Sequence, residues 1–382
     1  MGPLRSAMTA LSGFLLPPLK PKLRRVPLHE FITQLAAGKI LSDAQARTAI
    51  AELVREDVPA EIKADFLSAL ARKGESIEEI TAFAASLRDK AVPVPLDPQT
   101  RDREILDVVG TGGDRLNTFN ISSTAALLCA AAGVTVAKHG NRAATSASGS
   151  ADVLEALGIP LNLNPAEAAA ALREVGFAFF FAPNYHPSFK HIAPARKLCA
   201  ERGQRTIFNL LGPLLNPVRP TAMLLGVPRP DMCEPIARVL QSLGVRRAMV
   251  VCGEVPDAER AESVRYLDEI STLGETTVAE FYQERGFTVS KFNPDNFPLH
   301  PATLADLVGG DKLANAETAR RILRGDERGP KRDAVLLNAA AALFVAGRCR
   351  SIAEGWELAE RLIADGKAAA KLAQLTERRS QP

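Results

Sequence analysis

A short apolar run that leads directly into a glycine-rich turn constrains the fold of this chain more than any other feature. Residues 105–109 (ILDVV) have the character of a buried strand, and GTGGD at 110–114 follows at once, before a long Ala/Leu-rich helical stretch. Three glycines in four positions let backbone amides turn inward around an anion, and the following helix N-terminus adds free amides and a dipole. The arrangement predicts a phosphate-binding loop. An ordinary strand-to-helix turn, capped by Asn120 or Ser122, is the alternative.

Short apolar or β-branched runs alternate with helical stretches through the middle of the chain. Further runs of this kind fall at 134–137, 177–181, 222–227 and 248–252, and helical patterns return at 333–346 and 352–365. This alternation predicts an α/β domain over 104–376, with a central, mostly parallel or mixed sheet flanked by helices.

Residues 27–93, which precede this domain, predict consecutive helices. SDAQ from Ser42 and SIEE from Ser76 fit the capping box, in which a serine side chain and the residue three positions later satisfy each other's free backbone amides. Prolines at 93, 95 and 98 then break the helical pattern. We therefore expect a small all-helical domain followed by a linker.

The N-terminal segment and the overall composition bear on the location of the protein. Residues 1–26 carry five basic residues and no acidic one, so we expect a basic, flexible arm. The formal net charge of the whole chain is only +3, too small to imply nucleic-acid binding. No apolar run reaches the ~18 residues of a membrane span. Five widely spaced cysteines without a CxxC pair indicate reduced thiols and predict a cytoplasmic protein.

A second polar loop follows the next predicted strand. KHGNR at 138–142 and TSASGSAD at 145–152 bring cations and hydroxyl groups together around small residues. Because α/β sheets bind ligands at the carboxyl ends of their strands, two such loops on neighbouring strands predict one large phosphorylated ligand. In the alternative interpretation, Lys138 and Arg142 are solvated loop charges.

Two later segments carry further candidate groups. The stretch 183–217 contains histidines, aromatic residues and arginines, and an arginine fork suits a planar carboxylate. His186 and His191 are five positions apart, which argues against a shared metal on one helix face. The adjacent Asp268 and Glu269 suit Mg²⁺, which needs only one or two protein carboxylates when ligand phosphates supply other oxygens. An exposed acidic pair on the surface is the alternative.

Taken together, these motifs resemble those of the anthranilate phosphoribosyltransferase family of tryptophan biosynthesis. GTGGD, TFNIS, KHGNR, SGSADVLEALG, RTIFNLLGPLLNP, LDEIS and RDAVLLNAA are similar to that family's motifs in order and spacing, over about residues 27–375. The resemblance implies a class IV phosphoribosyltransferase fold, close to that of nucleoside phosphorylase II, with a later segment at about 187–212 completing the helical domain. It also implies a homodimer and a Mg²⁺-dependent transfer from phosphoribosyl pyrophosphate to anthranilate.

The resemblance also assigns residues to each ligand. Those assigned to phosphoribosyl pyrophosphate are Gly110, Gly112, Gly113, Asp114, Thr118, Asn120, Ile121, Ser122, Ser123, Lys138, His139, Gly140, Asn141, Arg142, Ala143, Ala144, Thr145, Ser146 and Ser150. Those assigned to anthranilate are Gly110, Asn141 and Arg196, with His186 and Pro183 along its entry path. Those assigned to magnesium, as two ions, are Ser122, Asp268 and Glu269. No general base is assigned.

The chain departs from the family pattern in three places. Ser123 stands where Thr is usual and Thr145 where Ser is usual, and both changes keep a hydroxyl. The stretch 254–266 is longer than the usual loop, and Tyr266 replaces a glycine directly before LDE, so we expect an altered approach of the acidic pair. Two other functions stay open: a transferase or phosphorylase of the same fold with a different acceptor, and a non-catalytic relative that binds nucleic acid through the basic arm.

Overall fold

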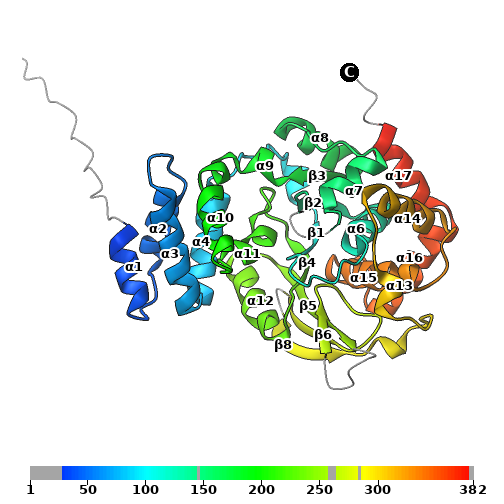
Figure 1. Ribbon diagram of the computed structural model, residues 1–382. Helices are drawn as coiled ribbons and strands as arrows, with labels where there is room; N and C mark the ends of the chain where they lie inside the picture. The colour runs from blue at the N-terminus through cyan, green and yellow to red at the C-terminus, as the bar shows by residue number, and fades with distance from the viewer. Residues whose placement is uncertain (1–27, 144–146, 257–263, 283–284, 378–382) are drawn as a thin grey trace, which may run out of the picture.

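The structure is a computed structural model that describes residues 28–143, 147–256, 264–282 and 285–377, so the predicted basic arm at 1–26 lies outside it. A helical bundle, blue in Figure 1, stands beside a larger α/β body. Its helices are α1 (Leu28–Ala36), α2 (Asp43–Leu53), α3 (Ala60–Lys73) and α4 (Ile77–Asp89). Both predicted capping boxes are confirmed, because Ser42 pairs with Gln45 and Ser76 pairs with Glu79.

A segment far along the chain packs against this bundle. It comprises the 3₁₀ turn η1 (Pro187–His191), α10 (Ala193–Glu201), α11 (Phe208–Leu211) and the 3₁₀ turn η2 (Gly212–Leu215). The buried Lys63 of α3 donates from Nζ to the His191 carbonyl at 2.8 Å. Arg88 of α4, whose pKa burial lowers to about 10, donates from Nε to the Leu214 carbonyl at 2.5 Å. Buried cations therefore join the bundle to the segment that leads back to the sheet.

The central sheet has eight strands in the described residues, in the order β3-β2-β1-β4-β5-β7-β8, with β6 also pairing β5. The first five strands along the chain are mutually parallel: β1 (Ile105–Gly110), β2 (Thr135–Gly140), β3 (Phe177–Phe181), β4 (Ala222–Gly226) and β5 (Arg247–Pro256). They confirm the predicted mostly parallel sheet. Three antiparallel strands that the sequence pattern did not predict extend it: β6 (Val264–Leu267), β7 (Thr276–Tyr282) and β8 (Arg285–Phe292).

Each central strand contributes side chains to the cores on both faces of the sheet, because successive side chains point to opposite sides. In β4, Leu224 joins a core beneath α6 (Ile121–Ala131) and α15 (Pro330–Val345). Its neighbours Met223 and Leu225 join a second core, which α12 (Cys233–Ser242) and the helical bundle share. Figure 1 shows these helices on the two sides of the sheet. The bundle is therefore fixed to the α/β body by a common core.

The remaining helices cover the periphery of the sheet. They are α5 (Pro98–Arg101), α7 (Ser150–Leu157), α8 (Pro165–Val175), α9 (Ala182–Tyr185), α13 (Leu304–Leu307), α14 (Lys312–Arg324), α16 (Ile352–Ala364) and α17 (Lys367–Glu377), with 3₁₀ turns η3 (Pro230–Met232) and η4 (Pro294–Asn296). Within the described ranges, none of the helices combines the length and apolarity that crossing a membrane requires.

Candidate active site

The carboxyl ends of the parallel strands form the edge at which the two predicted loops begin. β1 ends at Gly110, which is in register with Gly226 of β4, and β2 ends at Gly140, which is in register with Phe181 of β3. The first loop leaves β1 and the second leaves β2, and these strands are neighbours in the sheet. The topology therefore brings both glycine-rich loops to one edge.

Asp268 packs against the glycines that end β1 and β4. A Cβ atom added at Gly226 would lie 1.6 Å from the Asp268 backbone oxygen, and one added at Gly110 would lie 2.8 Å from Asp268 Oδ2. This close approach lets Asp268 Oδ2 accept hydrogen bonds from Gly112 N at 2.5 Å and from Thr111 Oγ1 at 3.3 Å. In this structure a carboxylate thus occupies part of the amide-lined turn predicted to bind an anion.

Glu269 lies at the N-terminus of α6. Its Oε1 atom accepts a hydrogen bond at 3.1 Å from Ser122 N, one of the amides that a first helical turn leaves free. Asn120, the N-cap residue, makes no side-chain capping bond; its Nδ2 instead donates to the Ser148 carbonyl of the second loop at 3.2 Å. Glu269 therefore takes the capping role that the alternative interpretation of the turn assigned to Asn120 or Ser122.

The acidic groups of this edge are hard to ionise together. Burial raises the pKa of Asp268 well above its ordinary value, and the charges of Asp114 and Glu269 raise it further. Desolvation raises the pKa of Glu269 to about 7, although the cation of Lys138 works in the opposite direction. Lys138 is itself buried, with Nζ donating to the Val108 carbonyl at 2.5 Å. The clustered carboxylates would gain from a further positive charge.

These residues fit a hard divalent cation. Ser122, Asp268 and Glu269 are held together by the Ser122–Glu269 hydrogen bond, and their hydroxyl and carboxylate oxygens are the donors that magnesium prefers. In the described part of the chain, no group of three or more His, Cys, Asp or Glu side chains forms a ready-made metal site. Magnesium usually binds through one or two carboxylates together with substrate phosphates, so such a site suits a cation that arrives with its ligand.

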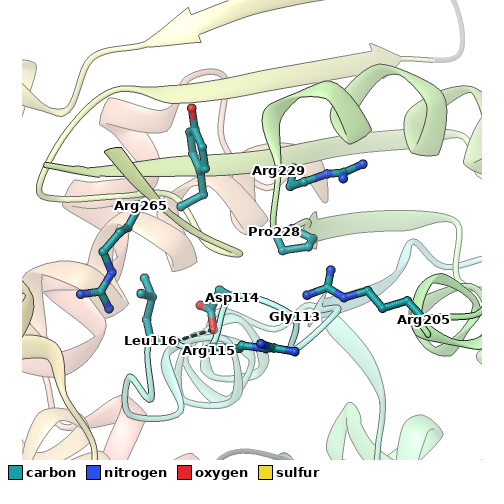
Figure 2. Close-up of a pocket in the computed structure, with 9 residues that line it drawn as sticks. Gly113, Asp114, Arg115, Leu116, Arg205, Pro228, Arg229 and Arg265 are labelled. Carbon is teal, nitrogen blue, oxygen red and sulfur yellow. Dashed lines mark hydrogen bonds between the residues drawn. The ribbon is translucent and has the colours of Figure 1, made fainter. Parts of the chain in front are cut away.

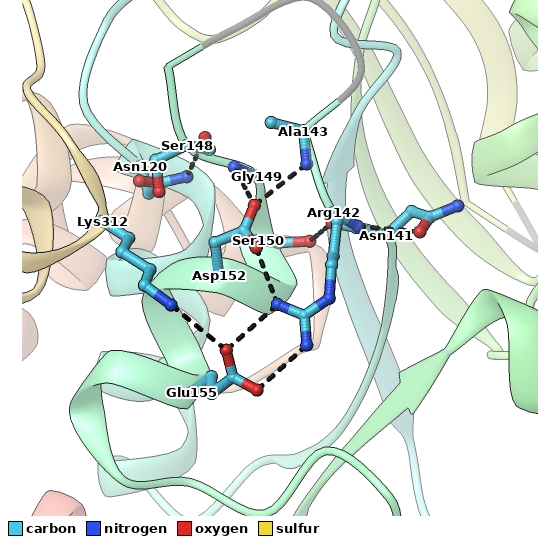
Figure 3. A network of polar contacts seen from close by, with 10 residues as sticks. All are labelled: Asn120, Asn141, Arg142, Ala143, Ser148, Gly149, Ser150, Asp152, Glu155 and Lys312. Carbon is cyan, nitrogen blue, oxygen red and sulfur yellow. Dashed lines mark hydrogen bonds and ion pairs between the residues drawn. The ribbon is translucent and has the colours of Figure 1, made fainter.

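The second loop is held by a network of side chains near the surface (Figure 3). Arg142 pairs with Asp152 at 2.8 Å and with Glu155 at 2.9 Å, and Lys312 reaches Glu155 at 3.5 Å. Asp152 Oδ2 also accepts hydrogen bonds at 3.0 Å from the amides of Ala143 and Gly149, across the base of the loop. The guanidinium of Arg142 is thus engaged with carboxylates, and the predicted residues Ala144, Thr145 and Ser146 lie outside the described residues.

The side chains of the two histidines assigned to the ligands are buried. His139 and His186 pack edge to face with ring centroids 5.4 Å apart, and His186 Nε2 lies 2.9 Å from the Leu215 carbonyl. Burial and the neighbouring His186 lower the pKa of His139 to about 3, so this ring is neutral. The buried Asp107 accepts hydrogen bonds from the His139 amide at 3.4 Å and from Asn216 Nδ2 at 2.9 Å. The sequence analysis did not predict that Asp107 accepts these two hydrogen bonds.

The residues assigned to anthranilate come from separate elements. Arg196 is exposed on α10, where its guanidinium lies 5.5 Å from the Phe208 ring centroid. Pro183 is exposed on α9, whereas His186 is enclosed. Asn141 is exposed; its Oδ1 accepts a hydrogen bond from the Arg142 amide at 2.8 Å, and Figure 3 shows its side-chain nitrogen pointing away from the network. Asn141, Arg196 and Pro183 are therefore available to a ligand, while the His186 ring is held by its neighbours.

The stretch before the acidic pair, predicted to be longer than the family's usual loop, includes the paired arms of a hairpin. β5 and β6 pair antiparallel from Gly253 opposite Leu267 out to Pro256 opposite Val264, and residues 257–263 lie outside the described residues. The paired base of the hairpin ends at Leu267, directly before Asp268. Asp268 follows this paired base and binds the first loop, and the predicted effect of the longer stretch on the acidic pair stays a prediction.

A cavity of about 350 Å³ opens beside the first loop (Figure 2). Its walls come from the loop itself, from the chain before α11, from the turn after β4 and from β6. The lining residues are Gly113, Asp114, Arg115, Leu116, Arg205, Pro228, Arg229, Arg265 and Tyr266. The four arginines come from four separate segments, so the sequence pattern gave no indication that they meet.

Comparison with known proteins gives the family. The profile of the "Glycosyl transferase family, a/b domain" matches residues 102–369, and that of the "helical bundle domain" of the same family matches residues 29–91. The chain is 46% identical to the anthranilate phosphoribosyltransferase of Lacticaseibacillus casei (strain BL23), over 94% of this chain and 96% of the relative. The chain belongs to the anthranilate phosphoribosyltransferase family. The relative from Symbiobacterium thermophilum is also 46% identical, over 92% of this chain and 97% of its own length.

Solved structures of the anthranilate phosphoribosyltransferase family agree with this fold. The crystal structure of the Thermus thermophilus enzyme superposes with a TM-score of 0.81 at 40% identity, covering 92% of this chain and 99% of that chain. The Saccharomyces cerevisiae enzyme in complex with PRPP and Mg gives 0.77 at 26% identity, covering 92% and 98%. The family and fold predicted from the motifs are confirmed, and the chain is a phosphoribosyltransferase of tryptophan biosynthesis.

Proposed function

We propose that the phosphoribosyl transfer takes place at the carboxyl edge of β1, β2 and β4, between the two glycine-rich loops. The observation that carries this proposal is the contact of the acidic pair with the glycine-rich turn and with the N-terminus of α6 that follows it. Asp268 binds the Gly112 amide, and Glu269 binds the Ser122 amide at the helix N-terminus. Phosphate-binding backbone and cation-binding carboxylates are thus built into one site.

In this proposal the donor, phosphoribosyl pyrophosphate, lies along the two loops. The backbone at 110–114 and the first turn of α6 lie along its phosphates, with the Gly112 and Ser122 amides held by the acidic pair, and the Asn120–Ser148 hydrogen bond joins the two loops. The second loop, which starts at the end of β2, contacts the other end of the donor. Binding across both loops holds the ribose carbon in a fixed position for attack.

We further propose that Ser122, Asp268 and Glu269 hold magnesium, as two ions, when the donor is bound. The oxygen donors, their mutual contacts and the crowding of carboxylates support this assignment. The S. cerevisiae relative is in complex with PRPP and Mg. Magnesium, when bound, supplies positive charge that stabilises the pyrophosphate leaving group.

The acceptor side of the site needs orientation more than proton transfer. Anthranilate would place its carboxylate on the Arg196 fork and its amine near Asn141 and Gly110, with Pro183 at the entry. An aromatic amine is nucleophilic in its neutral form, so the nitrogen can attack the ribose carbon directly while pyrophosphate leaves. His139 is buried and neutral, and no general base is required of it.

Two further properties belong to the same proposal. The family resemblance favours a homodimer joined through the helical bundle. Ile40, which is 54% exposed, lies in the turn between α1 and α2 and adds apolar surface. All five cysteines are free thiols in the structure, which supports a cytoplasmic location.

The fluorescence of anthranilate tests the proposed reaction directly. Purified protein mixed with anthranilate, phosphoribosyl pyrophosphate and Mg²⁺ should consume the fluorescent acceptor, and chelator should stop the decay. Decay that persists in chelator would contradict the role of magnesium. Binding of the donor without any decay would mean that the phosphate loops are correct and the acceptor is not.

A further inference from the structure

A segment late in the chain packs directly against the stretch that joins the glycine-rich turn to α6. Residues 117–119 and 307–309 are joined by an antiparallel bridge, beside which the Phe119 amide donates to the Leu307 carbonyl at 3.0 Å. A Cβ atom added at Gly309 would lie 2.8 Å from Phe119 Cα, so the close approach requires a glycine. Because the late segment leads into α14, the approach brings the start of that helix beside the N-terminus of α6.

Asn315, which is 3% exposed near the start of α14, connects the two helices. Its Oδ1 accepts a hydrogen bond from Gly310 N at 2.8 Å, and its Nδ2 donates to Asn120 Oδ1 at 3.1 Å. Asn120 Nδ2 in turn donates to the Ser148 carbonyl at 3.2 Å, a bond that Figure 3 shows at the base of the second loop. Two side-chain amides in series therefore link α14 to the second loop.

The backbone groups at the two ends of this series fix the direction of every hydrogen bond in it. The Gly310 amide can only donate, so the atom of Asn315 that faces it must be the oxygen. Asn315 then presents its nitrogen to Asn120, and Asn120 is left with its nitrogen for the Ser148 carbonyl, which can only accept. If the Asn120 amide turned over, nitrogen would face nitrogen on one side and oxygen would face oxygen on the other. Asn315 thus determines which end of the Asn120 amide faces the second loop.

A second contact from the same helix reaches the second loop at the surface. Lys312 Nζ lies 3.5 Å from Glu155 Oε2, within the network that holds Arg142. Exposed ion pairs of this kind contribute little and are screened by salt, whereas the Asn315 side chain is buried. The series through Asn315 is therefore the stronger means by which α14 fixes the second loop relative to α6.

We propose that Asn315 is a positioning residue for the transfer, which acts through Asn120 to hold the second loop at the spacing that the donor requires. The inference rests on the proposed function in one respect, the placement of the donor along both loops. Ordering a loop on binding costs free energy, so a donor that contacts two loops binds best where their spacing is set beforehand. Loss of the Asn120–Ser148 bond should weaken donor binding and leave the proposed carboxylate contact at Arg196 unchanged.

Two substitutions at Asn315 separate the polarity of its amide from its packing. In Asn315→Asp, one carboxylate oxygen still accepts from Gly310, but the other faces Asn120 and draws the Asn120 nitrogen away from Ser148. In Asn315→Ala, the Asn120 amide stays free to bind Ser148. Calorimetry with phosphoribosyl pyrophosphate and Mg²⁺ should therefore show roughly tenfold weaker binding for Asn315→Asp and a smaller loss for Asn315→Ala.

Ala319→Gly is the matched control, because it weakens α14 at a buried position one turn farther along and leaves the amide series intact. It should bind the donor as tightly as wild type. In steady-state kinetics, Asn315→Asp should raise the KM for the donor roughly tenfold and change the KM for anthranilate less than about twofold. Wild-type donor binding by Asn315→Asp, or an equal loss in Asn315→Ala or in the control, would overturn the proposal.

Hydrogen–deuterium exchange tests the link without any ligand. The amides of residues 147–152 should exchange faster in Asn315→Asp than in wild type, and at the wild-type rate in Ala319→Gly. Unchanged exchange in Asn315→Asp would overturn the proposal whether or not wild type binds the donor. Faster exchange together with a wild type that does not bind phosphoribosyl pyrophosphate would support the link and contradict the proposed function, so the two failures are distinguishable.

Discussion

The two glycine-rich loops occupy neighbouring strand ends but are held in place by different kinds of contact. The first loop is fixed from within, by the buried carboxylate of Asp268 and by strand-end glycines that leave room for it. The second is fixed at the surface, by Arg142, Asp152 and Glu155. Buried contacts tolerate little change, whereas exposed ion pairs contribute modestly and are screened by salt. The first loop should therefore be the less tolerant of substitution.

The largest effect is expected from Asp268→Asn combined with Glu269→Gln. The amides keep the shape of the pair but remove the negative charge that would hold magnesium, so kcat/KM should fall by roughly 100-fold or more. Thermal unfolding should change little, because the substitutions are close in volume. Wild-type turnover of this variant at saturating Mg²⁺ would refute the metal assignment.

A steric change in the same region should come next. In Gly226→Ala the added Cβ would lie 1.6 Å from the Asp268 backbone oxygen, so the acidic pair must move. Because a displacement of about 1 Å at a reacting site costs on the order of 100-fold, kcat/KM should fall by up to that factor, together with the melting temperature. Gly286→Ala, where nothing lies within 4 Å of the added atom, is the matched control. Equal kcat/KM of the two variants would mean that the activity does not depend on the position of Asp268.

A variant outside both loops provides the reference for the comparison. Arg196→Ala should raise the KM for anthranilate by roughly tenfold, the range expected for a lost charge-assisted hydrogen bond, and leave the KM for the donor unchanged. Steady-state kinetics with each substrate varied in turn measure both constants. An unchanged anthranilate KM would move the carboxylate site away from α10.

The smallest effect should come from the second loop. Asp152→Asn removes charge from a group that binds Arg142 and two loop amides, so the KM for the donor should rise several-fold, by about 1 kcal/mol of binding. Glu155→Gln removes only the exposed ion pair and should have less effect, within about 0.5 kcal/mol. The difference from wild type should shrink as NaCl is raised. If Asp152→Asn or Glu155→Gln lowered kcat/KM more than Gly226→Ala does, the second loop and not the first would be the less tolerant of substitution.

Local sequence pattern predicted much of the fold and several of the segments that meet at the carboxyl edge of the sheet. The five parallel strands, the glycine-rich turn and the acidic pair are each encoded in a few consecutive residues, so pattern and motif were sufficient. The antiparallel β7 was not predicted, although TTVAEFY contains a strand-like pattern, because the predicted strands were those that alternate with helices.

The contacts that position these motifs could not be predicted from local pattern. Asn120 is a common helix cap by type, yet its side chain binds Ser148, 28 residues away. Arg142 is of a residue type that commonly binds phosphate. Its partners Asp152 and Glu155 become its neighbours only when α7 forms beside the loop. The arginines of the cavity are separated by as much as 150 positions, from Arg115 to Arg265. Each of these contacts depends on tertiary packing.

The β5–β6 hairpin holds the chain directly before the acidic pair. β5 and β6 pair from Pro256 opposite Val264 to Gly253 opposite Leu267, so the backbone that leads into Asp268 is held by the sheet. The exposed outer end of the paired strands, at Pro256 and Val264, is therefore an attachment point for a fluorophore or an affinity tag, through which the enzyme could be immobilised or followed during turnover.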